Sequence, residues 1–149
     1  MFTREDEKYM RAALLEAETA LNEGEIPVGC VIADDSGILA SAHNLCEQTG
    51  DVTAHAELLA IKKLPRAVLR GARMYVTLEP CPMCAGAIAL AGLKKLVYAA
   101  RDSQYGCCGS VYRITEDPAF PSYCPADGGL LEEESRALLK RGFDKMRKK

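Results

Sequence analysis

The chain has 149 residues, of which 48% are hydrophobic and 27% are charged, and its net charge is −2 at neutral pH. These values describe an ordinary soluble protein, long enough to bury a substantial core. The slight negative charge argues against a nucleic-acid-binding surface over most of the molecule. We expect a single domain over residues 1–149.

The charge is unevenly distributed along the chain. Residues 1–60 carry three basic and twelve acidic side chains, whereas residues 61–149 carry sixteen basic and nine acidic ones. The two balances, −9 and +7, leave room for a localised basic face that could bind a phosphate backbone. Charges scattered over an ordinary surface explain the same balances equally well.

The N-terminal residues are mostly charged from Thr3 to Lys8, so they do not resemble a signal peptide. No apolar run is long enough to span a bilayer. Seven cysteines without secretory features favour a reducing compartment. We therefore expect a cytoplasmic protein with no membrane partner.

The first predicted element is a helix from about residue 3 to residue 23. Thr3 is a suitable N-cap, and acidic residues fill the first turn, where they interact favourably with the helix dipole. Hydrophobic residues then recur at helical spacing, so one side of this helix should face the core. These residues are Met10, Ala13, Leu14, Ala17 and Leu21.

Residues 28–33 and 38–43 form two short strand patterns joined by a polar turn, and together they predict a β-hairpin. His43 ends the second strand, where a histidine without a nearby partner is more often structural than a metal ligand. Asn44 follows it, before the polar loop at residues 47–51, and a turn residue is the simplest interpretation.

The later elements alternate between helix and strand. They are a helix from near Ala54 to Pro65, a strand at 74–78, a helix from Pro80 or Pro82 to about Gly92, and a strand at 94–99. Strand–helix–strand units imply parallel pairing, with right-handed crossovers and helices on both faces of the sheet. The predicted fold is a three-layer α/β/α sandwich with a central mixed sheet.

Beyond Ala100 the sequence becomes irregular. Adjacent Cys107 and Cys108 favour a tight loop of small residues over a second metal or redox site. Three prolines, at 118, 121 and 125, are expected to keep the next segment free of regular structure. A last helix is predicted over residues 130–148, with acidic residues near its start and basic ones, Lys149 included, near its end. Helix stability explains that polarity as well as nucleic-acid binding does.

Two short motifs carry the candidate chemistry, Thr-Ala-His-Ala-Glu at residues 53–57 and Glu-Pro-Cys-Pro-Met-Cys at residues 79–84. His55, Cys81 and Cys84 are ligand types that zinc accepts, and three protein ligands leave the fourth tetrahedral position for water, as in catalytic sites. A lone Cys-x-x-Cys also occurs in redox motifs and zinc ribbons. The pairing of both motifs near predicted helix starts therefore favours a catalytic zinc ion.

Glu57 is the carboxylate of the first motif, and we interpret it as the catalytic acid and base. Zinc lowers the pKa of a bound water toward neutrality. Two thiolate ligands cancel much of the metal's charge, so a nearby base is valuable. In this hypothesis Glu57 takes a proton from the attacking water and passes protons to the substrate, a role that typically contributes on the order of 10²–10⁴-fold in rate.

The two motifs form the signature of zinc-dependent nucleobase deaminases. Together with the segments 25–29, 75–87, 100–102 and 109–110, they make the chain resemble the bacterial tRNA-specific adenosine deaminases of the cytidine and deoxycytidylate deaminase superfamily. The resemblance implies hydrolytic conversion of the wobble adenosine of a tRNA anticodon to inosine, with one zinc ion per chain. It also implies a tRNA anticodon stem-loop as partner and assembly as a homodimer.

The resemblance further implies that Asn44 hydrogen-bonds the purine, that Val28 and Ala54 line its pocket, and that Asp102 holds a neighbouring ribose. The chain departs from the family pattern at three places: the loop at residues 45–49 lacks basic residues, Val52 replaces a usual proline, and residues 121–123 replace a commonly basic stretch.

Two alternatives remain open at this point. One is a deaminase of free guanine, cytosine or a nucleoside with the same zinc centre. The other is a non-catalytic zinc-binding or RNA-binding module, against which Glu57 argues because it adjoins an open coordination position.

Overall fold

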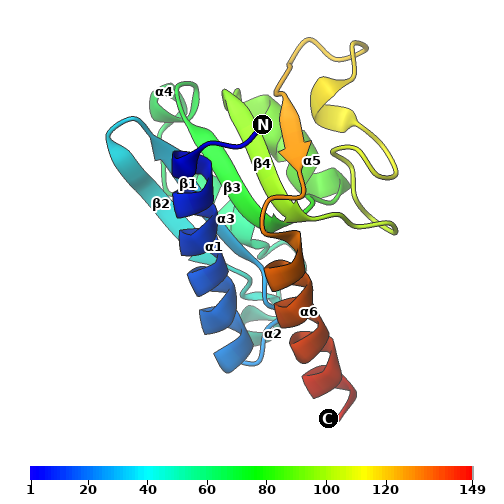
Figure 1. Cartoon of the computed structure of the whole chain (residues 1–149). Helices are drawn as coiled ribbons and strands as arrows, with labels where there is room; N and C mark the ends of the chain where they lie inside the picture. The colour runs from blue at the N-terminus through cyan, green and yellow to red at the C-terminus, as the bar shows by residue number, and fades with distance from the viewer. Residues whose placement is uncertain (149) are drawn as a thin grey trace.

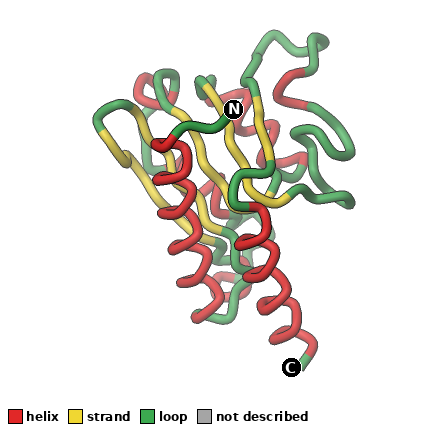
Figure 2. Tube along the Cα trace, viewed as in Figure 1, coloured by secondary structure: helices red, strands yellow, loops and turns green. Residues whose placement is uncertain are grey.

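The structure, a computed structural model, describes residues 1–148 and contains a five-stranded sheet in the order β2-β1-β3-β4-β5 (Figures 1 and 2). The strands are β1 Gly29–Asp34, β2 Gly37–His43, β3 Arg73–Leu78, β4 Lys95–Ala100 and β5 Ala126–Gly128. The helices are α1 Arg4–Asn22, α2 Cys46–Thr49, α3 Ala56–Lys62, α4 Arg66–Leu69, α5 Pro82–Ala91 and α6 Glu132–Arg147, with a 3-10 turn, η1, at Ile114–Glu116. Lys149, predicted to contribute to the basic end of the last helix, lies outside the described residues.

The sheet is mixed, as predicted. β1 pairs antiparallel with both β2 and β3, whereas β4 pairs parallel with both β3 and β5. β2 and β3 therefore run in the same direction with β1 between them, so the connection through α3 passes over one strand. The unit β3–α5–β4 joins neighbouring parallel strands, as the sequence indicated.

Helices cover both faces of the sheet, which confirms the predicted three layers. α1 and α6 lie side by side over one face (Figure 1), and α3 and α5 pack together on the other. Successive strand residues point to opposite faces. Val31, Tyr75 and Val97 join the core beneath α1, and their neighbours Ile32, Met74 and Leu96 join the core on the side of α3 and α5.

The start of α1 confirms the predicted cap. The Thr3 side chain accepts a hydrogen bond from the Asp6 N–H, and the Asp6 carboxylate accepts one from the Thr3 N–H. This reciprocal arrangement satisfies two of the N–H groups that a helix start leaves without partners. Asp6 also accepts a hydrogen bond from the Tyr75 hydroxyl at 2.8 Å, which ties α1 to the sheet.

Four short elements, the 3-10 turn η1 among them, were not predicted. α2 forms where a polar loop was expected, because the buried Glu25 carboxylate accepts hydrogen bonds from the N–H groups of Glu47 and Gln48. α4 follows Pro65 directly. β5 forms just after Pro125, so the prediction of irregular structure there was wrong: proline lacks an N–H but keeps its carbonyl, which accepts a hydrogen bond from the Leu96 N–H.

Within residues 1–148, none of the helices combines the length and the hydrophobicity needed to cross a bilayer. All seven cysteines are free thiols, and five of them are buried: Cys30, Cys84, Cys107, Cys108 and Cys124.

Candidate metal centre and adjoining cavity

Two helix starts bring the predicted metal ligands together. His55 is the N-cap of α3, Cys81 is the N-cap of α5, and Cys84 lies in the first turn of α5. α3 and α5 follow β2 and β3, so both starts lie at the same edge of the sheet, where ligands of α/β folds collect. The His55 Nδ1 atom lies 3.7 Å from the Cys81 sulfur and 3.5 Å from the Cys84 sulfur.

These distances fit a tetrahedral zinc site. Bonds of about 2.3 Å to sulfur and about 2.0–2.1 Å to nitrogen place tetrahedral nitrogen and sulfur ligands roughly 3.6 Å apart. All three ligand atoms lie within 4.8 Å of one another, and in residues 1–148 no other trio of His, Cys, Asp or Glu side chains has metal-binding spacing. Cys107 and Cys108 are buried free thiols in a loop, in agreement with the packing interpretation of this pair.

The surroundings of Cys81 favour its thiolate. Hydrogen bonding with Cys84 and with His55 outweighs partial burial and lowers the pKa of Cys81 to about 4. Cys81 also lies at the positive end of the α5 dipole. The thiolate is the form that binds metals, and the lowered pKa makes Cys81 a thiolate at neutral pH.

Glu57 lies beside the three ligands in the first turn of α3 and is only 4% exposed. Burial raises the pKa of Glu57 to about 7, although its own backbone N–H and the charge of His55 favour the ionised form. A carboxyl group that titrates near neutrality can both take up and release a proton during one reaction. The acid–base role of Glu57 stays a prediction, which its position beside the ligands and its raised pKa support.

The metal centre adjoins a cavity of about 630 Å³. This volume lies in the range of roughly 300–1,000 Å³ that is usual for small-ligand sites. The predicted site residues that line it are Val28, Asn44, His55, Glu57, Cys81 and Asp102. Ala54 was also predicted to line the pocket, but it is not among the lining residues: it is buried, and its carbonyl accepts a hydrogen bond from the Leu45 N–H.

Asn44 connects the cavity to the metal centre. Its Oδ1 atom accepts a hydrogen bond of 2.9 Å from the N–H of Ala56, the first residue of α3. This bond fixes the side chain next to His55 and engages its oxygen, so the amide N–H is the group that Asn44 can offer to a ligand. Asn44, which the sequence suggested was a turn residue, is therefore also held in place by a hydrogen bond from the start of α3.

Sequence reasoning missed several residues of the cavity. Among them are Glu25, Glu79, Met83, Tyr105 and Phe143. Tyr105 and Phe143 are exposed aromatic side chains, one in the loop after β4 and the other on α6. No local sequence pattern predicts that these two residues line the cavity, because only the tertiary fold brings this loop and α6 to the candidate metal centre.

A second cavity, of about 590 Å³, adjoins the first between α6 and the loop after β4. The two share Leu78, Asp102, Tyr105 and Phe143. Its basic lining residues are Arg101, Arg136, Lys140 and Arg147. This groove places four basic residues of the C-terminal half, each of them ion-paired with Glu132 or Asp144, beside the cavity at the candidate metal centre.

His43 does not join the metal cluster, in agreement with the structural interpretation of this residue. Its Nδ1 lies 2.6 Å from a Glu16 carboxylate oxygen and its Nε2 lies 2.8 Å from one of Glu23. Burial alone would lower the pKa of His43, but hydrogen bonds to the two carboxylates outweigh it and raise the pKa above 6.5. Both ring nitrogens can donate only in the imidazolium form.

We expect His43 to make stability depend on pH. Because its pKa is raised on folding, its stabilisation is fully present below the unfolded value of 6.5 and is lost as the pH rises through the folded value. His43→Gln should lower the free energy of unfolding more at about pH 6 than at about pH 9. Denaturant unfolding of both proteins at the two pH values measures this difference, and an equal effect at both would contradict it.

Comparison with known proteins agrees with the geometry. Residues 3–100 match the profile of the cytidine and deoxycytidylate deaminase zinc-binding region. The chain is 42% identical to the tRNA-specific adenosine deaminase of Bacillus subtilis (strain 168), over 97% of this chain and 92% of that protein. It is 40% identical to the tRNA-specific adenosine deaminase of Aquifex aeolicus (strain VF5), over 95% of each protein.

Solved structures give the same result for the fold. A structure from a study of A-to-I editing by tRNA:A34 deaminases superposes with a TM-score of 0.82 and 38% identity, covering 88% of this chain and 98% of that chain. A guanine deaminase from Nitrosomonas europaea superposes with a TM-score of 0.78 at 21% identity, covering 91% of this chain and 83% of that chain. At that identity the second likeness concerns the fold alone.

Proposed function

The chain belongs to the zinc-dependent cytidine and deoxycytidylate deaminase family, and we propose that it hydrolyses the wobble adenosine of a tRNA anticodon to inosine. The main observation in favour of this substrate is the sequence identity to tRNA-specific adenosine deaminases, which extends over nearly the whole length of this chain and of those relatives. The groove beside the candidate metal centre supports it, because its four basic residues outnumber the acidic Asp102 and Asp144 that also line it, and a net positive groove suits the phosphates that flank a flipped-out base.

The residues divide the reaction between them. His55, Cys81 and Cys84 would hold zinc, which supplies Lewis-acid activation of water when bound. Glu57 accepts a proton from the water that attacks C6 of adenine. It delivers this proton to N1, then takes the remaining proton from the oxygen now bound to C6 and passes it to the departing amine, so that water and adenosine yield inosine and ammonia. Asn44 offers its amide N–H to the purine, while Val28 and Asp102 contact the base and a neighbouring ribose.

Incubation with an anticodon stem-loop RNA, and separately with free adenine, guanine, cytosine and adenosine, tests the proposal. We expect inosine in the RNA and an equal amount of ammonia, with much slower release of ammonia from the free compounds. Binding should weaken steeply with salt, with a logarithmic slope of about −0.7 per phosphate contacted in a single strand. Rapid deamination of a free base, with no inosine in the RNA, would instead identify a free-base deaminase.

A homodimer is part of the same proposal. α5 carries no charged side chain, and it is apolar on its outward side as well as on its buried side. The residues of that outward side are Met83, Gly86, Ala87 and Leu90, of which Leu90 is 78% exposed. A helix that is hydrophobic all round is normally buried, so this side suits a second copy of the chain.

Leu90→Glu should therefore shift the protein from dimer to monomer, because it places a charge on the most exposed residue of this outward side. Leu15→Glu is the matched control, since Leu15 is also an exposed leucine on a helix but lies on the opposite face of the sheet. Light scattering after size exclusion measures both masses. A dimer that survives Leu90→Glu places the interface elsewhere.

The cellular location is proposed to be the cytoplasm. All seven cysteines are free thiols, and a chain with this many thiols suits a reducing compartment.

A further inference from the structure

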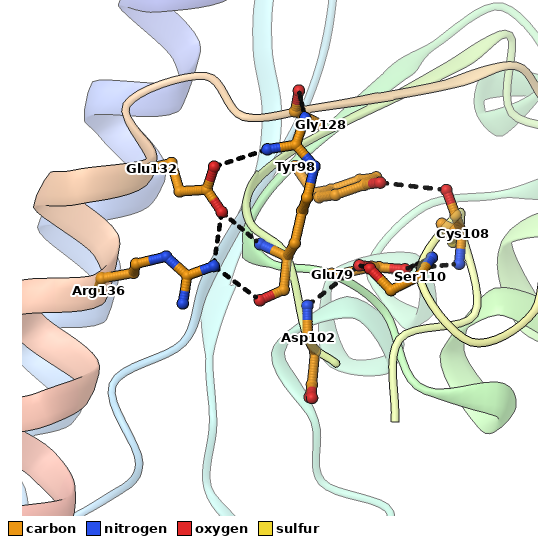
Figure 3. Close-up of polar contacts among 9 residues, drawn as sticks. Glu79, Tyr98, Asp102, Cys108, Ser110, Gly128, Glu132 and Arg136 are labelled. Atoms are coloured by element: carbon orange, nitrogen blue, oxygen red, sulfur yellow. Dashed lines mark hydrogen bonds and ion pairs between the residues drawn. The ribbon is translucent and has the colours of Figure 1, made fainter. Parts of the chain in front are cut away.

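Glu79 is a buried carboxylate that the proposed reaction does not use. It is 2% exposed and stands between β3 and α5, two residues before the ligand Cys81. Its two oxygens accept four hydrogen bonds, all from one later segment of the chain (Figure 3). The donors are the N–H groups of Asp102, Cys108 and Ser110 and the Ser110 hydroxyl.

The segment that Glu79 holds, residues 102–110, forms one wall of the cavity. Asp102 and Tyr105 line both the cavity at the candidate metal centre and the groove beside α6. The Asp102 side chain in turn accepts hydrogen bonds from the N–H groups of Gln104 and Tyr105, so the hydrogen bond that the Asp102 N–H donates to Glu79 fixes the start of the wall. The wall is further attached to the metal-ligand segment by a hydrogen bond of 2.9 Å from the Cys107 N–H to the Pro80 carbonyl.

The wall is folded tightly around the Glu79 side chain. A Cβ atom at Gly106 would overlap the Glu79 carboxyl group and the Asp102 carbonyl, so any larger residue there would displace the carboxylate. The Tyr98 hydroxyl donates to the Cys108 carbonyl and supports the wall from β4. Glu132 at the start of α6 accepts a hydrogen bond from the N–H of Arg101, the residue before Asp102 (Figure 3).

The chemistry requires a carboxylate at this position. Three backbone N–H groups and a hydroxyl converge on the two oxygens, and an ionised carboxylate is a side chain that offers only acceptors. The isosteric amide of glutamine would turn one of these positions into a donor that faces other donors. A buried N–H without a partner is costly, so the wall would move away from residue 79.

We propose that Glu79 is a positioning residue that keeps the substrate wall, residues 102–110, in register with the zinc ligands. It connects the two sides of the site: its backbone leads into Cys81, and its side chain holds the segment that carries Asp102 and Tyr105. The inference rests on the proposed function for the identity of the substrate, but the contact between Glu79 and the wall stands independently of it.

Glu79→Gln in the zinc-loaded enzyme tests the inference. Amide hydrogen exchange in residues 102–110 should accelerate, while the zinc content stays at that of the wild type. With an anticodon stem-loop as substrate, kcat/KM should fall on the order of 100-fold, chiefly through a higher KM, because a displaced wall misplaces the nucleotide. Ser110→Ala removes one of the four donors and keeps the carboxylate, so it should give an intermediate effect even if Glu79→Gln fails to fold.

Asp6→Asn is the matched control. Asp6 is also a buried, hydrogen-bonded carboxylate, but it lies in the first turn of α1, on the opposite face of the sheet. The Asp6→Asn substitution should lower the melting temperature and leave KM, kcat and amide hydrogen exchange in residues 102–110 unchanged. A wild-type enzyme that forms no inosine would defeat the proposed function, whereas the exchange measurement still decides the role of Glu79. Unchanged exchange and KM in Glu79→Gln, or loss of zinc from it, would overturn the inference.

Discussion

Replacing Glu57 with glutamine is expected to reduce kcat on the order of 10²–10⁴-fold, the usual contribution of a positioned acid–base group. The amide keeps the size and much of the polarity of the side chain but can no longer take up a proton. Because Glu57 is not one of the three proposed ligands, zinc should remain at one ion per chain. Single-turnover deamination of a stem-loop RNA, with metal analysis of the same sample, measures both quantities.

Asp6→Asn serves again as the control, since it also neutralises a buried carboxylate but lies far from the cavity. Its kcat should match that of the wild type. A Glu57→Gln enzyme with full activity would remove the proposed acid–base role. A Glu57→Gln enzyme without zinc would make Glu57 part of the metal centre instead.

Replacing Cys84 with serine is expected to abolish both zinc binding and turnover. The serine hydroxyl is a poor zinc ligand, and two remaining ligands cannot hold a tetrahedral ion. A metal present at 100 times its dissociation constant stabilises the native state by about 2.7 kcal/mol. For a chain of this length, that loss corresponds to roughly 5–10 °C in melting temperature.

A chelator provides the decisive comparison. It should lower the melting temperature of the wild type but not that of Cys84→Ser, because the variant has no zinc to lose. Cys124→Ala is the matched control: Cys124 is also a fully buried free thiol, but it lies outside the ligand cluster. Cys124→Ala should keep its zinc and its response to the chelator. A full complement of zinc in Cys84→Ser would show that the ligands were assigned incorrectly.

The sequence predicted the metal centre well because its parts are local. His55, Cys81 and Cys84 occupy short motifs at two helix starts, and helix starts follow from caps, prolines and apolar spacing within a few residues. The capping box at Thr3 and the β1–β2 hairpin were predictable for the same reason. The three-layer arrangement followed from the order of these elements.

The opposite wall of the cavity was not predictable in the same way. Tyr105 and Phe143 reach the cavity through contacts between segments far apart in the sequence, and no local periodicity predicts such contacts. β5 was missed because three prolines suggested irregular structure, although its pairing uses the Pro125 carbonyl. Ala54 was assigned to the cavity by resemblance alone, whereas its observed contact is a backbone hydrogen bond to Leu45.

The order of elements along the chain places the metal ligands well before the segments that complete the cavity. Glu57 and the three ligands have all left the ribosome once residue 84 has emerged, but the strand and helix that bring Phe143 to the cavity begin only at Ala126. A nascent chain therefore holds every atom needed to capture metal well before it can enclose a nucleotide. The ligands of the candidate metal centre and the α6 side of the substrate cavity thus come from separate parts of the chain.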